Sequence, residues 1–411
     1  MPDSKHMQVL VAHPGTQYAF GLAAELHRRG FLSRFYTGFA FPVGGLADVL
    51  SKVLSGAFGR WIANRQASIA SGKLRRSALR EFAALLQLKL GAEPQKVLYR
   101  RNAAFQRAIP DSAIAQVDVV IGFDTSSWIL AKRAREFGRT FFLDRSIGHP
   151  RAFAQVAKHL KNEFPEWSAQ IPGKTDEELL REDQEHILAT RIVVPSRYVA
   201  TTLTENGVDS AKIRINPFGT DLEHFQPAET PPSLKPLRFI FAGSLQPRKG
   251  LPLLLKAWSQ VPDSRGTELW IAGEGEIPAS VRREIPQNIR FLGRLAQADL
   301  SRAFRQCHVF VFPSYFEGLA QVQIEAAACG LPVIGTESSG CEEIVHHNET
   351  GFVLPAGDVD ALRSALVRFI LEPELVFSMR ERLLTQRNHW SWAAYGDRWA
   401  ALLREDLQQN N

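Results

Sequence analysis

The sequence predicts an α/β protein built from two domains, each with a doubly wound, mostly parallel sheet. Two observations lead to this prediction. The chain has 411 residues, which is more than one ordinary domain needs and enough for two hydrophobic cores. Short apolar runs alternate with segments of helical length along nearly the whole chain, a pattern typical of consecutive βαβ units.

The composition is that of an ordinary globular protein. Hydrophobic residues make up 45% and charged residues 22% of the chain, which excludes a disordered or collagen-like protein. The three cysteines, Cys307, Cys329 and Cys341, are too few and too irregularly spaced for a disulfide framework or a zinc ribbon. No apolar run approaches the ~20 residues that cross a bilayer, and residues 1–7 lack a signal-peptide core. We therefore expect a cytoplasmic protein.

The first half of the chain is expected to form one domain, over residues 7–212. Its strands are short apolar runs separated by helical patterns or by loops. They are predicted at residues 8–13, 33–38, 117–123, 140–143 and 191–195.

The second half shows the alternation more clearly, and we expect a second domain over residues 213–388. A break with four prolines at 226–236 is interpreted as the linker between the halves. Residues 389–411 carry aromatic and aliphatic residues at helical spacing and are expected to form a closing helix. The strands of this domain are predicted at residues 237–242, 268–272, 289–292, 308–312 and 332–335.

A basic segment at residues 51–107 interrupts the alternation, and its pattern is helical. It holds twelve Lys and Arg residues against two acids, so its net charge of +10 exceeds the +6 of the whole chain. Three interpretations stay open: a solvated insertion in the first domain, a surface for an anionic membrane or a lipid-linked acceptor, and a contact with an acidic acceptor or partner. Nucleic acid is the least favoured partner, because no recognition motif accompanies the charges.

Two glutamates eight residues apart form the strongest chemical signal. Glu317 lies on the loop after a predicted strand, and Glu325 lies on the helix that follows. The helical rise places them at most about 12 Å apart along the axis. Ligands of doubly wound sheets bind outside the carboxyl ends of the strands. The two carboxylates could there accept hydrogen bonds from two sets of sugar hydroxyls, whereas either one alone is more simply a helix-capping or a solvated residue.

The string around these glutamates, PSYFEGLAQVQIEAAACGLPVIG at 313–335, resembles the E-x7-E signature of the retaining family 4 glycosyltransferases of GT-B fold. Further segments are similar to that family's pattern and follow in its order: PFGTD at 217–221, FAGSL at 241–245 and RKG at 248–250. The resemblance implies two Rossmann-like doubly wound domains that face each other across a cleft. It also implies a C-terminal helix that crosses back to the first domain. The basic segment at residues 51–107 would then be a helical insertion in that domain.

The resemblance implies the transfer of a hexose from a UDP- or GDP-linked donor to a hydroxyl acceptor, either a saccharide or a lipid-linked glycan. Arg248 and Lys249 lie between a strand and a helix start, where two cations and free N–H groups suit a diphosphate and would replace a metal ion. Glu317 would hold the donor sugar and Glu325 the ribose. We expect no cofactor and no metal ion, the nucleotide sugar being a substrate.

Other residues complete the expected site. Gly15 follows the first strand and would let a phosphate or sugar approach the backbone, and His13 is close to it. His149 is expected on the acceptor side, with Asp144 as an alternative base, and Asp124 also follows a strand. The remaining donor-site positions that the resemblance implies are Gly243, Ser244, Leu292, Gly318, Leu319 and Ala320.

Two patterns that look like metal sites are interpreted as structural. Asp358 and Asp360 open a predicted helix, where acidic residues are typical. The adjacent His346 and His347 lack the spacing of zinc ligands. Two alternative functions stay open: a nucleotide-sugar isomerase or hydrolase of the same fold, and a non-catalytic protein that binds a nucleotide sugar or a membrane. For either function, any contact with the inner membrane face is expected to be peripheral and to involve residues 51–107.

Overall fold

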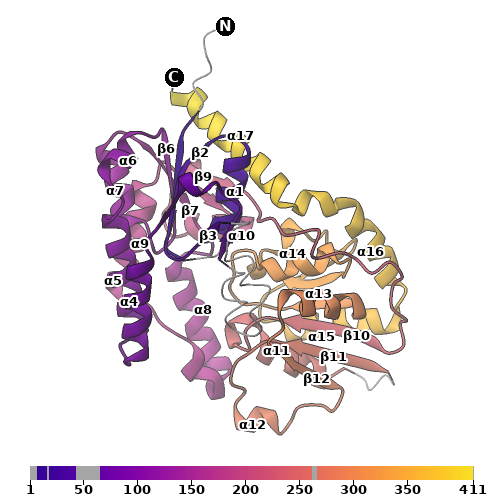
Figure 1. Ribbon diagram of the computed structural model, residues 1–411. Coiled ribbons are helices and arrows are strands. Elements are labelled where there is room, and N and C mark those ends of the chain that lie inside the picture. The colour runs from indigo at the N-terminus through magenta and orange to yellow at the C-terminus, as the bar shows by residue number, and fades with distance from the viewer. Residues whose placement is uncertain (1–6, 16–17, 43–64, 262–265, 411) are drawn as a thin grey trace.

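The computed structural model of the protein describes residues 7–15, 18–42, 65–261 and 266–410. Figure 1 shows two α/β domains beside each other, with the C-terminal helix α17 (Trp392–Asn410) running back to the first domain. Each domain has a central parallel sheet with helices packed against it. The predicted fold class, two doubly wound domains of Rossmann type, is confirmed.

The first domain contains a seven-stranded sheet in the order β5-β2-β1-β6-β7-β8-β9, with all neighbours parallel. The strand order reverses direction beside β1, which makes the carboxyl end of β1 a switch point where such folds bind ligands. The strands are β1 (Val9–His13), β2 (Leu32–Thr37), β5 (Leu74–Arg76), β6 (Val119–Phe123), β7 (Thr140–Asp144), β8 (Arg191–Val194) and β9 (Ile213–Ile215).

Helices cover both faces of this sheet, and the short strands β3 (Phe41–Pro42) and β4 (Gln66–Ala67) form a separate pair. The helices are α1 (Ala19–Arg28), α4 (Ala78–Lys89), α5 (Pro94–Arg107), α6 (Asp111–Ala115), α7 (Trp128–Glu136), α8 (Pro150–Glu163), α9 (Asp176–Leu188) and α10 (Arg197–Thr204). Every residue of β1 and β6 is buried, which is the pattern of central strands covered on both faces.

The second domain contains a six-stranded parallel sheet in the order β12-β11-β10-β13-β14-β15. Its strands are β10 (Leu237–Ala242), β11 (Thr267–Ala272), β12 (Ile289–Gly293), β13 (Val309–Phe312), β14 (Val333–Thr336) and β15 (Gly351–Leu354). Its helices are α11 (Leu251–Ser259), α12 (Ala279–Arg282), α13 (Gln297–Gln306), α14 (Gln321–Ala328), α15 (Val359–Leu371) and α16 (Leu375–Gln386). Asp358 accepts a hydrogen bond from the Ala361 N–H, so its interpretation as a helix cap is confirmed.

The structure differs from the sequence expectations at two places. The first sheet extends past residue 212, because β9 pairs with β8, so the change of domain comes after β9. The basic segment is not wholly helical, because Leu74–Arg76 pairs with β2 as an edge strand and buries Leu74 against the core. Both strands have only three residues, too short for an apolar pattern to reveal. Residues 51–64 of the basic segment lie outside the described residues.

The chain ends against the first domain. Helix α17 packs on α1, and an ion pair of 2.6 Å joins Arg29 to Asp397. The Trp392 ring fills the space beside Gly21, where an added Cβ would lie 2.8 Å from the ring. Among the described residues, no helix is both long enough and apolar enough to cross a membrane.

Candidate functional site

A cavity of about 630 Å³ lies at the carboxyl ends of the second-domain strands. This volume is within the range of roughly 300–1,000 Å³ that is usual for small-molecule sites. Strand ends, the loops that follow them and helix α14 form its wall. The polar or charged residues that line it are Ser244, Arg248, Lys249, Glu274, Arg294 and Glu325.

Two cations lie side by side in this cavity. Arg248 and Lys249 are on the one-turn helix Pro247–Lys249, between β10 and α11. Gly250 follows with φ of 78°, and an added Cβ would lie 1.9 Å from the carbonyl oxygen of Pro313, so only glycine allows this turn. The turn therefore fixes both cations at the carboxyl end of β10.

Glu317 joins the two cations. Its carboxylate forms ion pairs with the Arg248 guanidinium and the Lys249 ammonium. Arg248 also donates a hydrogen bond of 2.7 Å to the carbonyl oxygen of Phe316. Burial lowers the pKa of Lys249, although the neighbouring Glu317 opposes this shift. The structure thus brings together three residues that the sequence analysis assigned to the diphosphate and the sugar.

Glu325 faces the same cavity from α14. Its side chain is half-buried, and burial raises the pKa of its carboxyl group to about 7. Within the part of the chain that the structure describes, no hydrogen bond or ion pair to this carboxylate is found. Its acceptor oxygens are therefore free to bind hydroxyl groups of a ligand, which would offset the cost of its burial.

The loop after Glu317 lies against the first domain. Ser196 donates a hydrogen bond of 2.6 Å to the carbonyl oxygen of Gly318. An added Cβ at Gly318 would lie 1.8 Å from the Ser146 carbonyl oxygen, so a side chain is excluded here. Leu319 and Ala320, the next two residues, are buried. Gly318 therefore lies where the two domains meet.

Of the remaining predicted donor-site positions, two line the cavity and one does not. Gly243 and Ser244 line the cavity, whereas Leu292 is half-buried within β12 and packs against the core. The lining residues near this strand end are Arg294 and Leu295. The sequence analysis missed them, together with Glu274, although their positions after predicted strands were a usable signal.

Gly15 and His13 interact with each other at the carboxyl end of β1. The Gly15 N–H donates a hydrogen bond of 3.1 Å to Nδ1 of the buried His13. The His13 ring meets Phe123 edge to face, and burial lowers the pKa of His13 to about 4. The Gly15 amide that the sequence analysis assigned to a phosphate or sugar is therefore already bonded.

Asp144 and Asp124 are buried within the first domain. Asp144 accepts hydrogen bonds from Tyr18 (3.1 Å) and Tyr395 (3.4 Å), and burial raises its pKa well above the usual range. Asp124 accepts from the Ser146 hydroxyl at 3.0 Å. Both carboxyl groups therefore have partners within the protein.

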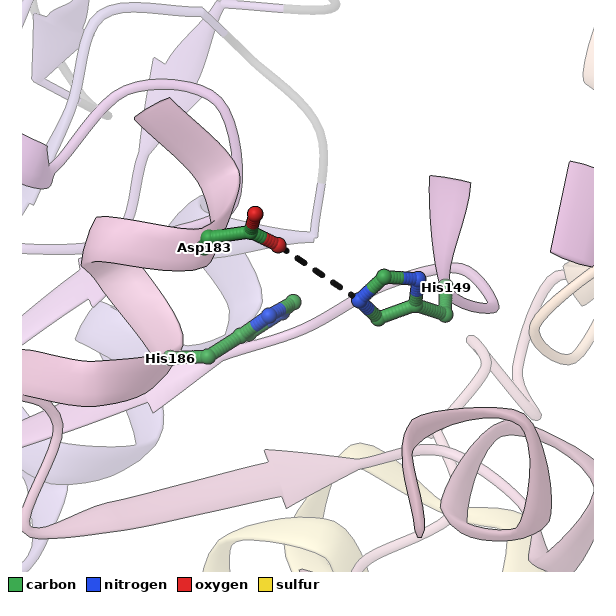
Figure 2. A group of neighbouring side chains, drawn as sticks. All are labelled: His149, Asp183 and His186. Carbon is green, nitrogen blue, oxygen red and sulfur yellow. Dashed lines mark ion pairs between the residues drawn. The ribbon is translucent and has the colours of Figure 1, made fainter. Parts of the chain in front are cut away.

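His149 is buried at the start of α8. Its Nδ1 accepts a hydrogen bond of 3.2 Å from the Arg151 N–H, and its Nε2 lies 3.8 Å from an oxygen of Asp183. Figure 2 shows that Asp183 and His186 approach it from α9. Burial lowers the pKa of His149 to about 4, so the ring is neutral at neutral pH. The sequence analysis missed Asp183 and His186, although their spacing of three along a helix puts them on one face.

The cluster of Figure 2 has the ligand types of a metal site, and the three candidate atoms lie within 4.8 Å of one another. Arg151, however, donates to both Asp183 oxygens at 2.6 Å. The fully buried Arg145 contributes a second positive charge nearby, which lowers the pKa of His149 further. In this structure the positive charge beside the Asp183 carboxylate is therefore the Arg151 guanidinium, in the place that a metal ion would take.

Arg145 organises the loop that carries His149. Its side chain is fully buried, forms an ion pair of 2.6 Å with Glu182, and donates to the carbonyl oxygens of Ile147 and Gly148. Gly148 in turn lies against the Phe316 ring, where an added Cβ would be 2.7 Å away. His149 is thus one residue from the contact between the domains.

Sequence comparisons with known proteins find glycosyltransferases. Residues 236–372 match the family model described as "Glycosyl transferases group 1". A GDP-mannose-dependent monoacylated alpha-(1-6)-phosphatidylinositol monomannoside mannosyltransferase of Corynebacterium glutamicum is 34% identical over 215 residues, 46% of this chain and 55% of that protein. A D-inositol 3-phosphate glycosyltransferase of Segniliparus rotundus is 26% identical over 236 residues, 52% of this chain and 53% of that protein. The chain spans about half the length of the curated relatives that it matches.

Solved structures are similar over nearly the whole chain. The sucrose-phosphate synthase of Thermosynechococcus elongatus has a TM-score of 0.67 at 20% identity, covering 98% of this chain and all of that one. The Anabaena protein HepE in complex with UDP and glucose has a TM-score of 0.63 at 14% identity, covering 97% of this chain and all of that one. At these identities the likeness concerns the fold.

Proposed function

Because residues 236–372 match the group 1 glycosyltransferases and the two domains have the GT-B fold, we propose that this chain transfers a hexose from a nucleotide sugar to a hydroxyl acceptor. We further propose that the transfer retains the anomeric configuration and needs no metal ion. One observation carries the proposal: Arg248, Lys249 and Glu325 line one strand-end cavity of the second domain, and Glu317 forms ion pairs with both of its cations.

Arg248 and Lys249 would bind the donor diphosphate. Without a ligand they share the Glu317 carboxylate, so an incoming diphosphate would replace a carboxylate as their anion. Lys249 is shielded from solvent, since burial lowers its pKa, and its ammonium lies 5.4 Å from the centre of the Phe312 ring. Positive charge acts more strongly there than in water. The two side chains would stabilise the negative charge that develops on the leaving diphosphate.

Glu325 and Glu317 would bind sugar hydroxyls on the two sides of the diphosphate. The unpartnered Glu325 carboxylate would accept from the ribose. Glu317, released from the two cations, would accept from the hexose, next to Gly318 and the first domain. The name of the corynebacterial relative favours a GDP-linked donor and a lipid-linked acceptor, and the UDP in the Anabaena structure favours a UDP-linked donor. Both donors stay in the proposal.

A thermal-shift panel of UDP, GDP, ADP and their sugars tests the donor site. A ligand at ~100 times its dissociation constant stabilises a folded protein by about 2.7 kcal/mol, so the true donor should raise Tm clearly. Lys249→Ala should abolish the shift, and Arg302→Ala, on the exposed side of α13, should keep it. If no nucleotide raises Tm, the proposal is wrong.

Product analysis separates transfer from the two alternatives. With donor alone, an isomerase or hydrolase would consume the nucleotide sugar, whereas a transferase needs an acceptor hydroxyl for rapid turnover. A non-catalytic binding protein would show the thermal shift without product in any mixture. The anomeric configuration of the product, read by NMR, tests retention. Activity that persists in excess chelator would support the metal-independent mechanism.

A further inference from the structure

An unusual apolar surface lies on helix α4 of the first domain. Of the twelve large hydrophobic residues that are exposed in the described chain, six lie within residues 82–98. Five of them form what we call the α4 patch: Phe82, Leu85, Leu86, Leu88 and Leu90, with exposed fractions of 63, 41, 50, 41 and 78%.

Among the described residues, the main contact of helix α4 is with helix α5. Its inner side packs on α5, where Glu81 forms an ion pair of 3.0 Å with Arg101, and α5 in turn packs on α7. Figure 1 shows α4 and α5 at the outer edge of the first domain. Phe82, Leu85 and Leu86 follow the spacing of neighbours on one helix face, so most of the patch faces outwards.

The exposure of the α4 patch indicates contact with an apolar partner. Contiguous exposed apolar surface is uncommon on monomeric soluble proteins and marks a site of contact with another surface. A solvated insertion would carry polar residues at these positions, since polar side chains are well hydrated and equally compatible with a helix. The structure therefore favours a contact surface over the solvated insertion that the sequence left open.

The charge around the α4 patch is positive. Lys89 lies within the apolar stripe, and the exposed Arg75 and Arg76 come just before the helix. Exposed Lys96 and Arg100 follow on α5. Residues 65–107 contain two acids, and each has a basic partner: Glu81 pairs with Arg101, and Glu93 pairs with Lys96 at 2.7 Å.

We propose that the α4 patch docks on an anionic phospholipid surface. A helix with a broad apolar face flanked by Lys and Arg lies in the interface between headgroups and acyl chains, and anionic lipids attract its charges. A second protein is the weaker fit, because the centres of protein interfaces are depleted in lysine and Lys89 lies within this stripe. An anionic phospholipid surface offers acyl chains to the apolar residues and negative headgroups to the basic ones.

The docked surface would adjoin the cleft. At Gly38, an added Cβ would lie 2.5 Å from the Pro14 carbonyl oxygen and 3.2 Å from the Glu81 carboxylate. Helix α4 therefore starts beside the loop that leaves β1, at the ligand-binding end of the first sheet. If the proposed transferase function holds, docking would hold this side of the cleft near a lipid-linked acceptor.

Vesicle flotation tests the docking without any donor or acceptor. The wild-type protein should float with vesicles of phosphatidylcholine and phosphatidylglycerol, and much less with phosphatidylcholine alone. Leu86→Ser with Leu90→Ser should lower the partition coefficient by at least roughly tenfold. Lys89→Gln with Lys96→Gln should also lower it and reduce its dependence on salt.

A matched control replaces two leucine-sized residues elsewhere. Ile187 and Leu371 are 66 and 75% exposed and lie outside the α4 patch, so Ile187→Ser with Leu371→Ser should float like the wild type. Each variant should keep the wild-type Tm and the nucleotide-induced Tm shift. These two readouts separate a loss of docking from misfolding and from a failure of the donor site.

Three outcomes would overturn the docking proposal. The wild type would fail to float with either vesicle, or the control variant would lose flotation as strongly as the patch variant. The third outcome is a wild-type dimer in sedimentation velocity that the patch variant dissociates, which would make a second copy of the chain the occupant.

Discussion

The two domains place carboxyl groups at the same end of their sheets, but one of these groups lacks a partner in the described chain and the other is bonded within the protein. In the second domain, Glu325 has a raised pKa, no partner in the described chain, and a cavity in front of it. In the first domain, Asp144 also has a raised pKa, but two tyrosines bond to it. The difference teaches that a perturbed pKa alone does not identify a site, because burial produces it in both places. An open cavity and unfilled acceptors identify the ligand-binding carboxylate.

The largest effect is expected at the buried ion pair of the first domain. Arg145→Ala leaves Glu182 buried beside one remaining cation, Lys174, and should lower the free energy of unfolding by about 3–5 kcal/mol. Urea unfolding measures this loss. A change below about 1 kcal/mol would mean that the network does not hold the loop, and the comparison between the domains would fail.

The next effect is on turnover and arises in the second domain. Lys249→Ala should reduce kcat about 10²–10³-fold, the usual cost of removing a donor that stabilises developing negative charge. The control is Arg302→Ala on the exposed side of α13, outside the lining of this cavity, where kcat should stay close to the wild-type value. Equal losses in the two variants would contradict the diphosphate role of Lys249.

The stability of Glu325→Gln should depend on pH. The folded-state pKa of Glu325, about 7, lies above its value in the unfolded chain, so ionisation of this group increasingly destabilises the wild type as the pH rises towards 7. The variant removes this effect. It should match the wild type near pH 4 and be about 2 kcal/mol more stable at pH 8 without ligand. Thermal unfolding across this pH range measures the difference, and a difference that does not change with pH would show that folding does not raise the pKa of Glu325.

The smallest effect is expected at Asp144. Its carboxyl group is buried with a raised pKa and two hydroxyl partners, so Asp144→Asn should change the free energy of unfolding by about 1 kcal/mol or less. Turnover should stay within twofold of the wild type. A large loss of turnover at unchanged Tm would instead make Asp144 a base in the reaction and break the contrast with Glu325.

The second domain could be predicted well from the sequence because its signals are local. Arg248 and Lys249 are adjacent, and Glu317 and Glu325 are separated by one short loop and about one helical turn. The strand, turn and helix that position each group are contiguous with it. Local turn chemistry, such as the left-handed Gly250, then fixes the geometry.

The first domain was harder to predict because its polar groups depend on distant residues. His149 is buried by Asp183 and His186, which lie on a helix more than thirty positions later. Asp144 bonds to Tyr395 at the far end of the chain. The Gly15 amide looked free for a ligand, yet His13 bonds to it. Motif spacing does not contain such long-range contacts.

The chain passes between the domains twice, and the two passages are in contact. Thr220, on the way out, forms a bridge with Ser391, on the way back, and Trp392 lies against Gly219. Arg398 adds hydrogen bonds to Asn216 and to the Pro217 carbonyl oxygen. Because the two crossings are neighbours and contact each other, they restrain how one domain can move relative to the other. Rotation about the line through the two crossings can open the cleft, while sliding or twisting of one domain past the other would break these contacts.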